Sequence, residues 1–159
     1  MKIEDWTHQY LDEIEEWRTY VRRYLFSNRV LAFIDIHMGD TITKSLYPST
    51  PQIVISNTCG ARIGGQTWYY KEDAEAYFEL SSWLLEEKKE VKRVLRHELG
   101  HYIKEYCGIK GIPHGKEYSK ILKLITGDGW KEDRHWHTTK AIERARLKIH
   151  PTSRAIKIR

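Results

Sequence analysis

Residues 88–107, KKEVKRVLRHELGHYIKEYC, decide the fold of this chain. Apolar residues recur in this stretch at spacings of three and four, the period of an α-helix with one buried face. The expected buried stripe consists of Val91, Val94, Leu95, Leu99 and Ile103. Gly108, Gly111 and Pro113 follow and are expected to end the helix. The stretch therefore predicts one long helix followed by a break.

This helix carries the pattern H-E-x-x-H at residues 97–101. Residues four apart share a helix face, so His97 and His101 can bind one ion. Zn²⁺ accepts neutral imidazole nitrogens, and a catalytic zinc site keeps one of its four positions open for water. Glu98 stands beside the open position, where its carboxylate can take a proton from that water as the catalytic base. The competing interpretation is a surface pair of histidines on an ordinary helix.

A third protein ligand is needed, and the candidates that follow the helix are Cys107, His114 and Glu117, of which Glu117 is the weaker ligand and the less well placed. A metzincin pattern would require glycine at position 104 and histidine at position 107, where this chain has Lys104 and Cys107. Cys107 can bind a metal as a thiolate, but a small buried thiol is the simpler interpretation. His114 stands at the start of the next expected helix, and a helix–loop–helix can return it to the metal face of the first helix. The sequence therefore favours His114 as the third ligand of one zinc ion.

The remaining segments predict an α+β fold, with a small mixed or antiparallel sheet packed on helices. The expected strands are residues 30–37, 52–56, 59–63, 66–70 and 76–80, with Gly64-Gly65 as a two-residue hairpin turn between the third and the fourth. The other expected helices are residues 3–26, 115–125 and 138–149, and residues 39–51 are expected to form a loop. The 159 residues suit a single domain, 1–159.

The basic charge of the chain belongs to its C-terminal end. The net charge is +5, but residues 138–159 alone carry +6 and residues 1–137 carry −1. A clustered basic end suggests a polyanion such as nucleic acid, and the alternative is a solvated tail. Two cysteines, no apolar run of roughly 20 residues and an N-terminus without an apolar signal region point to an intracellular protein without a membrane anchor.

Residues 129–137 interleave aromatic and basic side chains, which suits unpaired bases and phosphates, although packing of the tryptophans onto the domain is the favoured interpretation. The candidate nucleic-acid-binding residues are Trp130, Lys131, Arg134, Trp136, Arg144, Arg146, Lys148, Arg154, Lys157 and Arg159. His135 and His137 are more simply explained as solvated or hydrogen-bonded side chains than as a second metal site.

The chain resembles the SprT-like metalloprotease family, which includes bacterial SprT proteins and the Spartan proteases. The resemblance rests on the motif at 97–101, a twelve-residue spacer, and His114-Gly115 followed by Glu117 and aromatic Tyr118. It extends over roughly residues 55–127 and includes Asn57-Thr58-Cys59-Gly60-Ala61-Arg62 before the expected hairpin. Two features depart from the family: the four-cysteine zinc ribbon of many relatives is missing, and the chain ends at Arg159 without the long tail of Spartan-type proteins.

The resemblance implies a zincin-like protease domain with His97, His101 and His114 on zinc and Glu98 as general base. It also implies DNA-stimulated cleavage of proteins, including proteins crosslinked to DNA, hence a role in DNA repair. The expected partners are protein substrates and DNA, either single-stranded or containing junctions, with no membrane. We expect a monomer in the cytoplasm or at the nucleoid.

Two other functions remain open at this point. One is an intracellular zinc protease that cleaves a regulator without DNA, although such enzymes lack the segment around His114. The other is a non-catalytic DNA-binding module in which zinc only joins two helices, which Glu98 disfavours because structural sites usually fill all four positions. A substrate peptide is expected to pair with residues 76–80 as an edge strand. Tyr118 and Arg134 are candidates for stabilising the oxyanion, with Tyr118 better explained as core.

Overall fold

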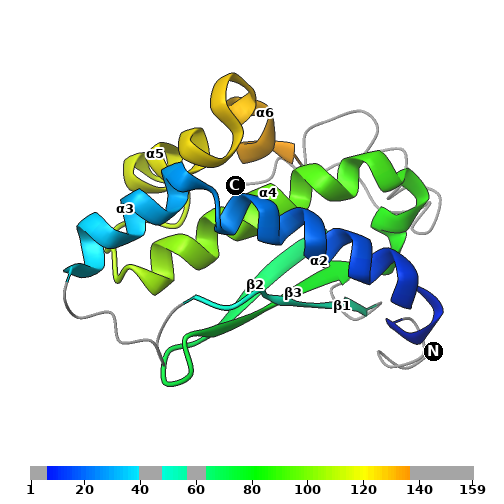
Figure 1. Cartoon of the computed structure of the whole chain (residues 1–159). Coiled ribbons are helices and arrows are strands. Elements are labelled where there is room, and N and C mark those ends of the chain that lie inside the picture. Colours follow the sequence, from blue (N-terminus) through cyan, green and yellow to red (C-terminus); the bar gives the residue numbers. More distant parts are fainter. Residues whose placement is uncertain (1–6, 40–47, 57–63, 137–159) are drawn as a thin grey trace.

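The structure, a computed structural model, describes residues 7–39, 48–56 and 64–136. Its elements form one mixed sheet with helices on one side of it (Figure 1). The strands are β1 (Gln52–Ser56), β2 (Gly65–Tyr70) and β3 (Glu75–Ser81). The helices are α2 (Leu11–Leu25), α3 (Asn28–Met38), α4 (Lys88–Tyr106), α5 (Lys116–Thr126) and α6 (Trp130–Arg134), with 3₁₀ turns η3 (Ser82–Glu87) and η4 (Gly127–Gly129). The mixed α+β architecture expected from the sequence is confirmed.

The three strands are arranged in the order β1-β3-β2, so β3 is the central strand. It runs parallel to β1 and antiparallel to β2. Residues 76–80 form a strand as predicted, but the expectation that this strand is an edge strand is wrong, because both of its sides are hydrogen-bonded. Among the described strands, β2 has β3 as its one neighbour, and Thr67 pairs with Phe78.

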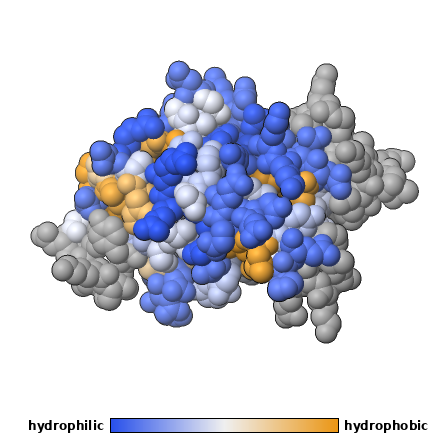
Figure 2. Space-filling model, turned by 45° about the vertical axis from the view of Figure 1, so that its right-hand side comes forward, coloured by the Kyte–Doolittle hydropathy of each residue, from blue (hydrophilic) through white to orange (hydrophobic). Residues whose placement is uncertain are grey.

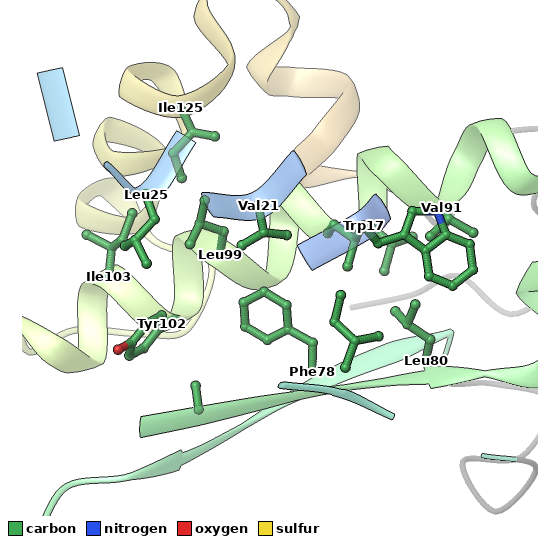
Figure 3. Close-up of a cluster of buried hydrophobic side chains, with 14 of the residues drawn as sticks. Trp17, Val21, Leu25, Phe78, Leu80, Val91, Leu99, Tyr102, Ile103 and Ile125 are labelled. Carbon is green, nitrogen blue, oxygen red and sulfur yellow. The ribbon is translucent and has the colours of Figure 1, made fainter. Parts of the chain in front are cut away.

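The core lies between the sheet and the two long helices, α2 and α4 (Figure 3). From α2, the predicted apolar face contributes Trp17, Val21 and Leu25, all buried. From β3, Phe78 and Leu80 point toward the helices and are fully buried. The predicted stripe of α4 is buried as well, from Val91 to Ile103. The periodicity of these helices therefore identified the faces that meet the sheet correctly.

Residues 30–37 form a helix, so the predicted strand there is wrong. Helix α3 begins after Ser27, whose side-chain oxygen accepts a hydrogen bond from the backbone N–H of Val30. Val30 and Ile34 are buried and stand four residues apart, which is the spacing of a helix face. The β-branched and aromatic composition that suggested a strand is overridden because this face packs against other helices.

The hairpin that the structure describes joins β2 and β3, whereas the predicted hairpin around Gly64-Gly65 stays a prediction. Strand β2 confirms residues 66–70 as a strand, but its partner is β3, and the connecting turn is Lys71 to Ala74. Ala74 has a φ of 52°, a conformation that non-glycine residues seldom adopt and that suits a tight turn. The predicted strand at 59–63 and the predicted helix at 138–149 lie outside the described residues.

The surface of the molecule is mostly hydrophilic on the face shown in Figure 2, with hydrophobic residues in separate small groups. Within the described residues, no helix combines the length and the apolar character needed to cross a bilayer.

Candidate metal centre

Three histidine rings converge at one point, two from α4 and one from the segment just before α5. The Nε2 atom of His97 lies 3.1 Å from Nε2 of His114 and 3.3 Å from Nε2 of His101. The Nε2 atoms of His101 and His114 lie 3.0 Å apart. Within the described residues, these three side chains form a group that can hold a metal ion.

The size of this triangle fits a tetrahedral zinc ion. A Zn–N bond of ~2.0–2.1 Å and tetrahedral angles place two ligand nitrogens about 3.3–3.4 Å apart. The observed separations of 3.0–3.3 Å are within a few tenths of an ångström of this value. Three nitrogens leave the fourth tetrahedral position for water or substrate, which is the ligand count of a catalytic site rather than a closed structural one.

The orientation of His97 is fixed from behind by a backbone carbonyl. Its Nδ1 atom lies 2.8 Å from the carbonyl oxygen of Asp133, which can only accept a hydrogen bond. Nδ1 therefore carries the proton, and the lone pair of Nε2 is left for a metal. Asp133 was not among the residues singled out in the sequence, because no motif marks a residue that acts through its main chain.

The other two rings are held in their neutral form by their surroundings. Burial lowers the pKa of His101 to about 3, and the nearby His114 and Lys104 act in the same direction. Burial also lowers the pKa of His114, with further contributions from Arg134, His135 and Lys104. Both rings are therefore neutral at neutral pH, which is the protonation state that binds a metal.

Glu98 lies on α4 beside this cluster and is almost fully buried, with 2% of its surface exposed. Its carboxylate accepts a hydrogen bond of 2.5 Å from the hydroxyl of Thr67 on β2. Burial raises the pKa of Glu98 to about 7, against the opposing effect of the Thr67 hydrogen bond. A carboxyl with a pKa near neutrality suits a general base or acid. Thr67 was missed in the sequence because β2 and α4 meet only in the folded chain.

Tyr118 is a core residue, which is the interpretation that the sequence favoured, and it joins the histidines to the rest of the fold. Its hydroxyl donates a hydrogen bond of 2.9 Å to the backbone carbonyl of His97, and its ring stacks on His101 at 4.5 Å between centroids. A Cβ atom at Gly100 would lie 2.8 Å from the Tyr118 ring, so glycine allows α5 to approach α4 this closely. With its hydroxyl bound to a main-chain carbonyl, Tyr118 is not free to stabilise an oxyanion.

A comparison with protein-family models matches residues 36–140 to the SprT-like family. The chain belongs to the SprT-like family. This membership indicates a zinc-dependent protease-like domain, in agreement with the three-histidine cluster. No curated protein and no solved structure gave a significant match to the chain.

The residues that the sequence suggested for binding nucleic acid have different surroundings in this SprT-like chain. Trp136 is 5% exposed, and its ring meets that of His97 edge to face at 6.1 Å, so stacking on a base would require it to leave the core. Trp130 is half-buried with the Lys123 ammonium over its ring, whereas Lys131 is exposed. Arg134 donates a hydrogen bond of 2.6 Å to the carbonyl of His114. The remaining candidates, Arg144, Arg146, Lys148, Arg154, Lys157 and Arg159, lie outside the described residues.

Cys107 ends α4 and does not belong to the metal-binding group. Burial raises the pKa of its thiol to about 12, which disfavours the thiolate that would bind a metal. Its surroundings therefore agree with the packing role that the sequence favoured.

Proposed function

We propose that this chain is a zinc-dependent endopeptidase with a zincin-like fold, in which His97, His101 and His114 hold one zinc ion and Glu98 is the general base. The observation that carries the proposal is the triangle of Nε2 atoms, 3.0–3.3 Å on each side, with a buried carboxylate on the same helix. A non-catalytic zinc site would need no such carboxylate and would usually complete its coordination with a fourth protein ligand.

A bound zinc ion would supply Lewis acidity, polarising the scissile carbonyl and lowering the pKa of water. Glu98 would accept the proton of the attacking water and pass it to the leaving amine. Its burial and its pKa near 7 support both transfers, because a carboxyl of this kind can take and return a proton at neutral pH. The Thr67 hydroxyl would hold the carboxylate in place between the two steps.

The substrate backbone is proposed to pair with β2 rather than with the central strand β3. Two observations support this placement: β2 has one neighbour among the described strands, and it carries Thr67, which contacts Glu98. Addition of a peptide to a sheet edge is a common way to bind extended polypeptides. Proline introduced at a substrate position whose backbone N–H would donate to β2 should block cleavage, and unimpaired cleavage of every such peptide would contradict this placement.

The proposed substrates are proteins associated with DNA or crosslinked to it, cleaved at the nucleoid with stimulation by single-stranded or junction-containing DNA. The support is the net charge of +6 on residues 138–159 together with the exposed Lys131 beside Trp130 on α6. Deletion of residues 138–159 should flatten the salt dependence of DNA affinity if this segment contacts phosphates. An unchanged slope would show that the positive charge of residues 138–159 does not contact the DNA phosphates.

The proposal is tested with purified protein whose zinc content has been measured. The protein is mixed with a basic DNA-binding protein, with and without single-stranded DNA, and self-cleavage is followed in parallel. We expect cleavage that requires zinc, increases with DNA and disappears in Glu98→Gln while zinc remains bound. Cleavage indifferent to DNA would indicate a regulator-cleaving protease. DNA binding by the zinc-loaded protein without any proteolysis would indicate a zinc-stapled binding module and refute the enzyme.

A further inference from the structure

The short helix α6 touches two of the three histidines of the metal centre from outside the ligand set. The carbonyl of Asp133 receives the Nδ1 proton of His97 at 2.8 Å. The next residue, Arg134, donates from Nη2 to the carbonyl of His114 at 2.6 Å. Two consecutive residues therefore contact the metal centre: Asp133 orients the His97 ring on α4, and Arg134 holds the segment before α5 that carries His114.

The position of these two residues is fixed by the side chain of Asp133, which is 1% exposed. Its carboxylate accepts two hydrogen bonds from Arg96, at 2.6 Å from Nε and at 2.8 Å from Nη2. The hydroxyl of Thr126 donates a third at 2.6 Å, and the Nε atom of Arg93 lies 3.6 Å away. A paired fork of this kind defines orientation as well as position, because both guanidinium donors must be aligned at once.

The anchor extends across the fold through Arg96. Its Nη1 atom donates to the hydroxyl of Tyr20 on α2, so α2, α4, α6 and the end of α5 meet at this ion pair. Such a pair is a weak source of stability, since removing two charges from water offsets most of their attraction. What it gives reliably is one defined geometry for the Asp133 carbonyl, and that carbonyl is bound to a metal-site ring.

We propose that Asp133 and Arg134 are positioning residues of the metal centre: Asp133, locked by Arg96, aims the His97 ring, and Arg134 holds the segment that carries His114. This inference rests on the proposed metal-binding function and adds residues to it. Partners that orient ligating histidines in this way typically change metal affinity 10–100-fold when they are replaced. Neither residue needs to contact the metal or the substrate for this effect.

The test measures zinc affinity by competition with a chromogenic chelator, and the absorption spectrum of the Co²⁺-substituted protein. Both are recorded at a temperature at which circular dichroism shows each variant to be folded. We expect Asp133→Asn to weaken zinc binding about 10–100-fold and to alter the Co²⁺ spectrum. Asp128→Asn is the matched control, because Asp128 lies in the same segment, is exposed and should change zinc affinity less than twofold.

Arg134→Gln and Lys116→Gln form a second matched pair: each removes one positive charge, the first from a residue bonded to the His114 carbonyl and the second from an exposed residue two positions after His114. We expect the former to weaken zinc binding about tenfold and the latter to leave it unchanged. Arg134→Lys, which keeps a donor, should recover part of the affinity. If Asp133→Asn does not fold, Thr126→Val takes its place, since it removes one hydrogen bond from the same carboxylate at nearly constant volume.

A control variant that is destabilised as much as Asp133→Asn, but at a distant position, shows whether loss of stability alone explains the loss of zinc affinity. Ile53→Ala creates a cavity at β1, which lies on the other side of β3 from β2 and Thr67, and it should lower the unfolding temperature without changing the Co²⁺ spectrum. The inference is overturned if Asp133→Asn and Arg134→Gln bind zinc as tightly as their controls with unchanged spectra. Failure of the unmodified protein to bind zinc at all would instead overturn the proposed function.

Discussion

Replacing Gly100 by alanine should destabilise this protein, although the same change in an ordinary helix does the opposite. Glycine in a helix interior is less favourable than alanine by about 1 kcal/mol, so Gly→Ala normally stabilises. Here a Cβ atom would lie 2.8 Å from Cε2 and 3.3 Å from Cζ of Tyr118. The ring has little room to retreat, because Tyr118 is fully buried, bonded to the His97 carbonyl and stacked on His101.

The expected magnitude follows from these opposing effects. Overpacking a filled core costs about 1–3 kcal/mol, and the helix propensity of alanine returns about 1 kcal/mol. We therefore expect Gly100→Ala to lower the free energy of unfolding by about 1 kcal/mol in urea denaturation followed by circular dichroism. Zinc affinity should fall as well, because Tyr118 can move away only by displacing the rings that it contacts.

A second background tests whether the Tyr118 ring is the cause. Tyr118→Leu keeps an apolar side chain but removes the three ring atoms that lie nearest to the added methyl group, Cε2, Cζ and the hydroxyl oxygen. Gly100→Ala should then stabilise by about 1 kcal/mol, as in an open helix. The two backgrounds should thus differ in sign and give a coupling of about 2 kcal/mol. Stabilisation by Gly100→Ala in the unmodified protein would refute the packing argument.

Three further predictions concern single side chains. Thr67→Val removes the hydroxyl that binds Glu98 and should lower the free energy of unfolding by about 1.5–3 kcal/mol, with reduced cleavage, whereas Thr67→Ser should retain both; equal loss in the two variants would show that the hydroxyl is irrelevant. In a Cys59→Ser background, Cys107 should react with iodoacetamide at pH 8 about a thousandfold more slowly in the folded protein than in urea, because burial raises its pKa from 9.0 to about 12. Since unfolding then releases a proton, the stability due to this thiol is present below about pH 9 and is lost as the pH rises toward 12; rapid labelling of the folded state would contradict the shift. Ser27→Ala should destabilise by about 1 kcal/mol in urea, with Ser27→Asp close to neutral, and no loss in the alanine variant would mean that this residue does not cap α3.

The parts of the fold that could be predicted are those in which a local period coincides with burial. Helix α4 shows this most clearly, since its apolar stripe from Val91 to Ile103 is the face that meets the sheet. Helix α3 shows the opposite case. Its composition favours a strand, whereas the Ser27 cap and the four-residue spacing of Val30 and Ile34 favour a helix, and the packing of that face against neighbouring helices decides between the two. The order of the strands was equally hidden, because pairing partners depend on the whole chain.

The metal centre divides in the same way. The proposed ligands on α4 and the proposed base could be found because their spacing follows from helix geometry, and His114 was chosen over Cys107 and Glu117. Thr67 and Asp133 could not be found, since each reaches the site through a contact more than 30 residues away in sequence. The aromatic and basic segment at 129–137 left both packing and nucleic-acid binding open; the Trp136 ring packs against His97, whereas Lys131 is exposed.

The two sequence motifs of the site, residues 97–101 and residues 114–118, pack against each other as one unit. Tyr118 follows His114 by four residues. The start of α5 therefore connects His114, which joins the histidine cluster, to Tyr118, which contacts Gly100. The loop between α4 and α5 reverses direction at Gly108, whose φ of 65° suits glycine. The Lys104 ammonium holds this loop by donating to the Gly111 carbonyl at 3.3 Å. The position of His114 is thus set by the approach of α5 to α4. A change in the length of this loop should therefore be tolerated only if the contact between Tyr118 and Gly100 is preserved.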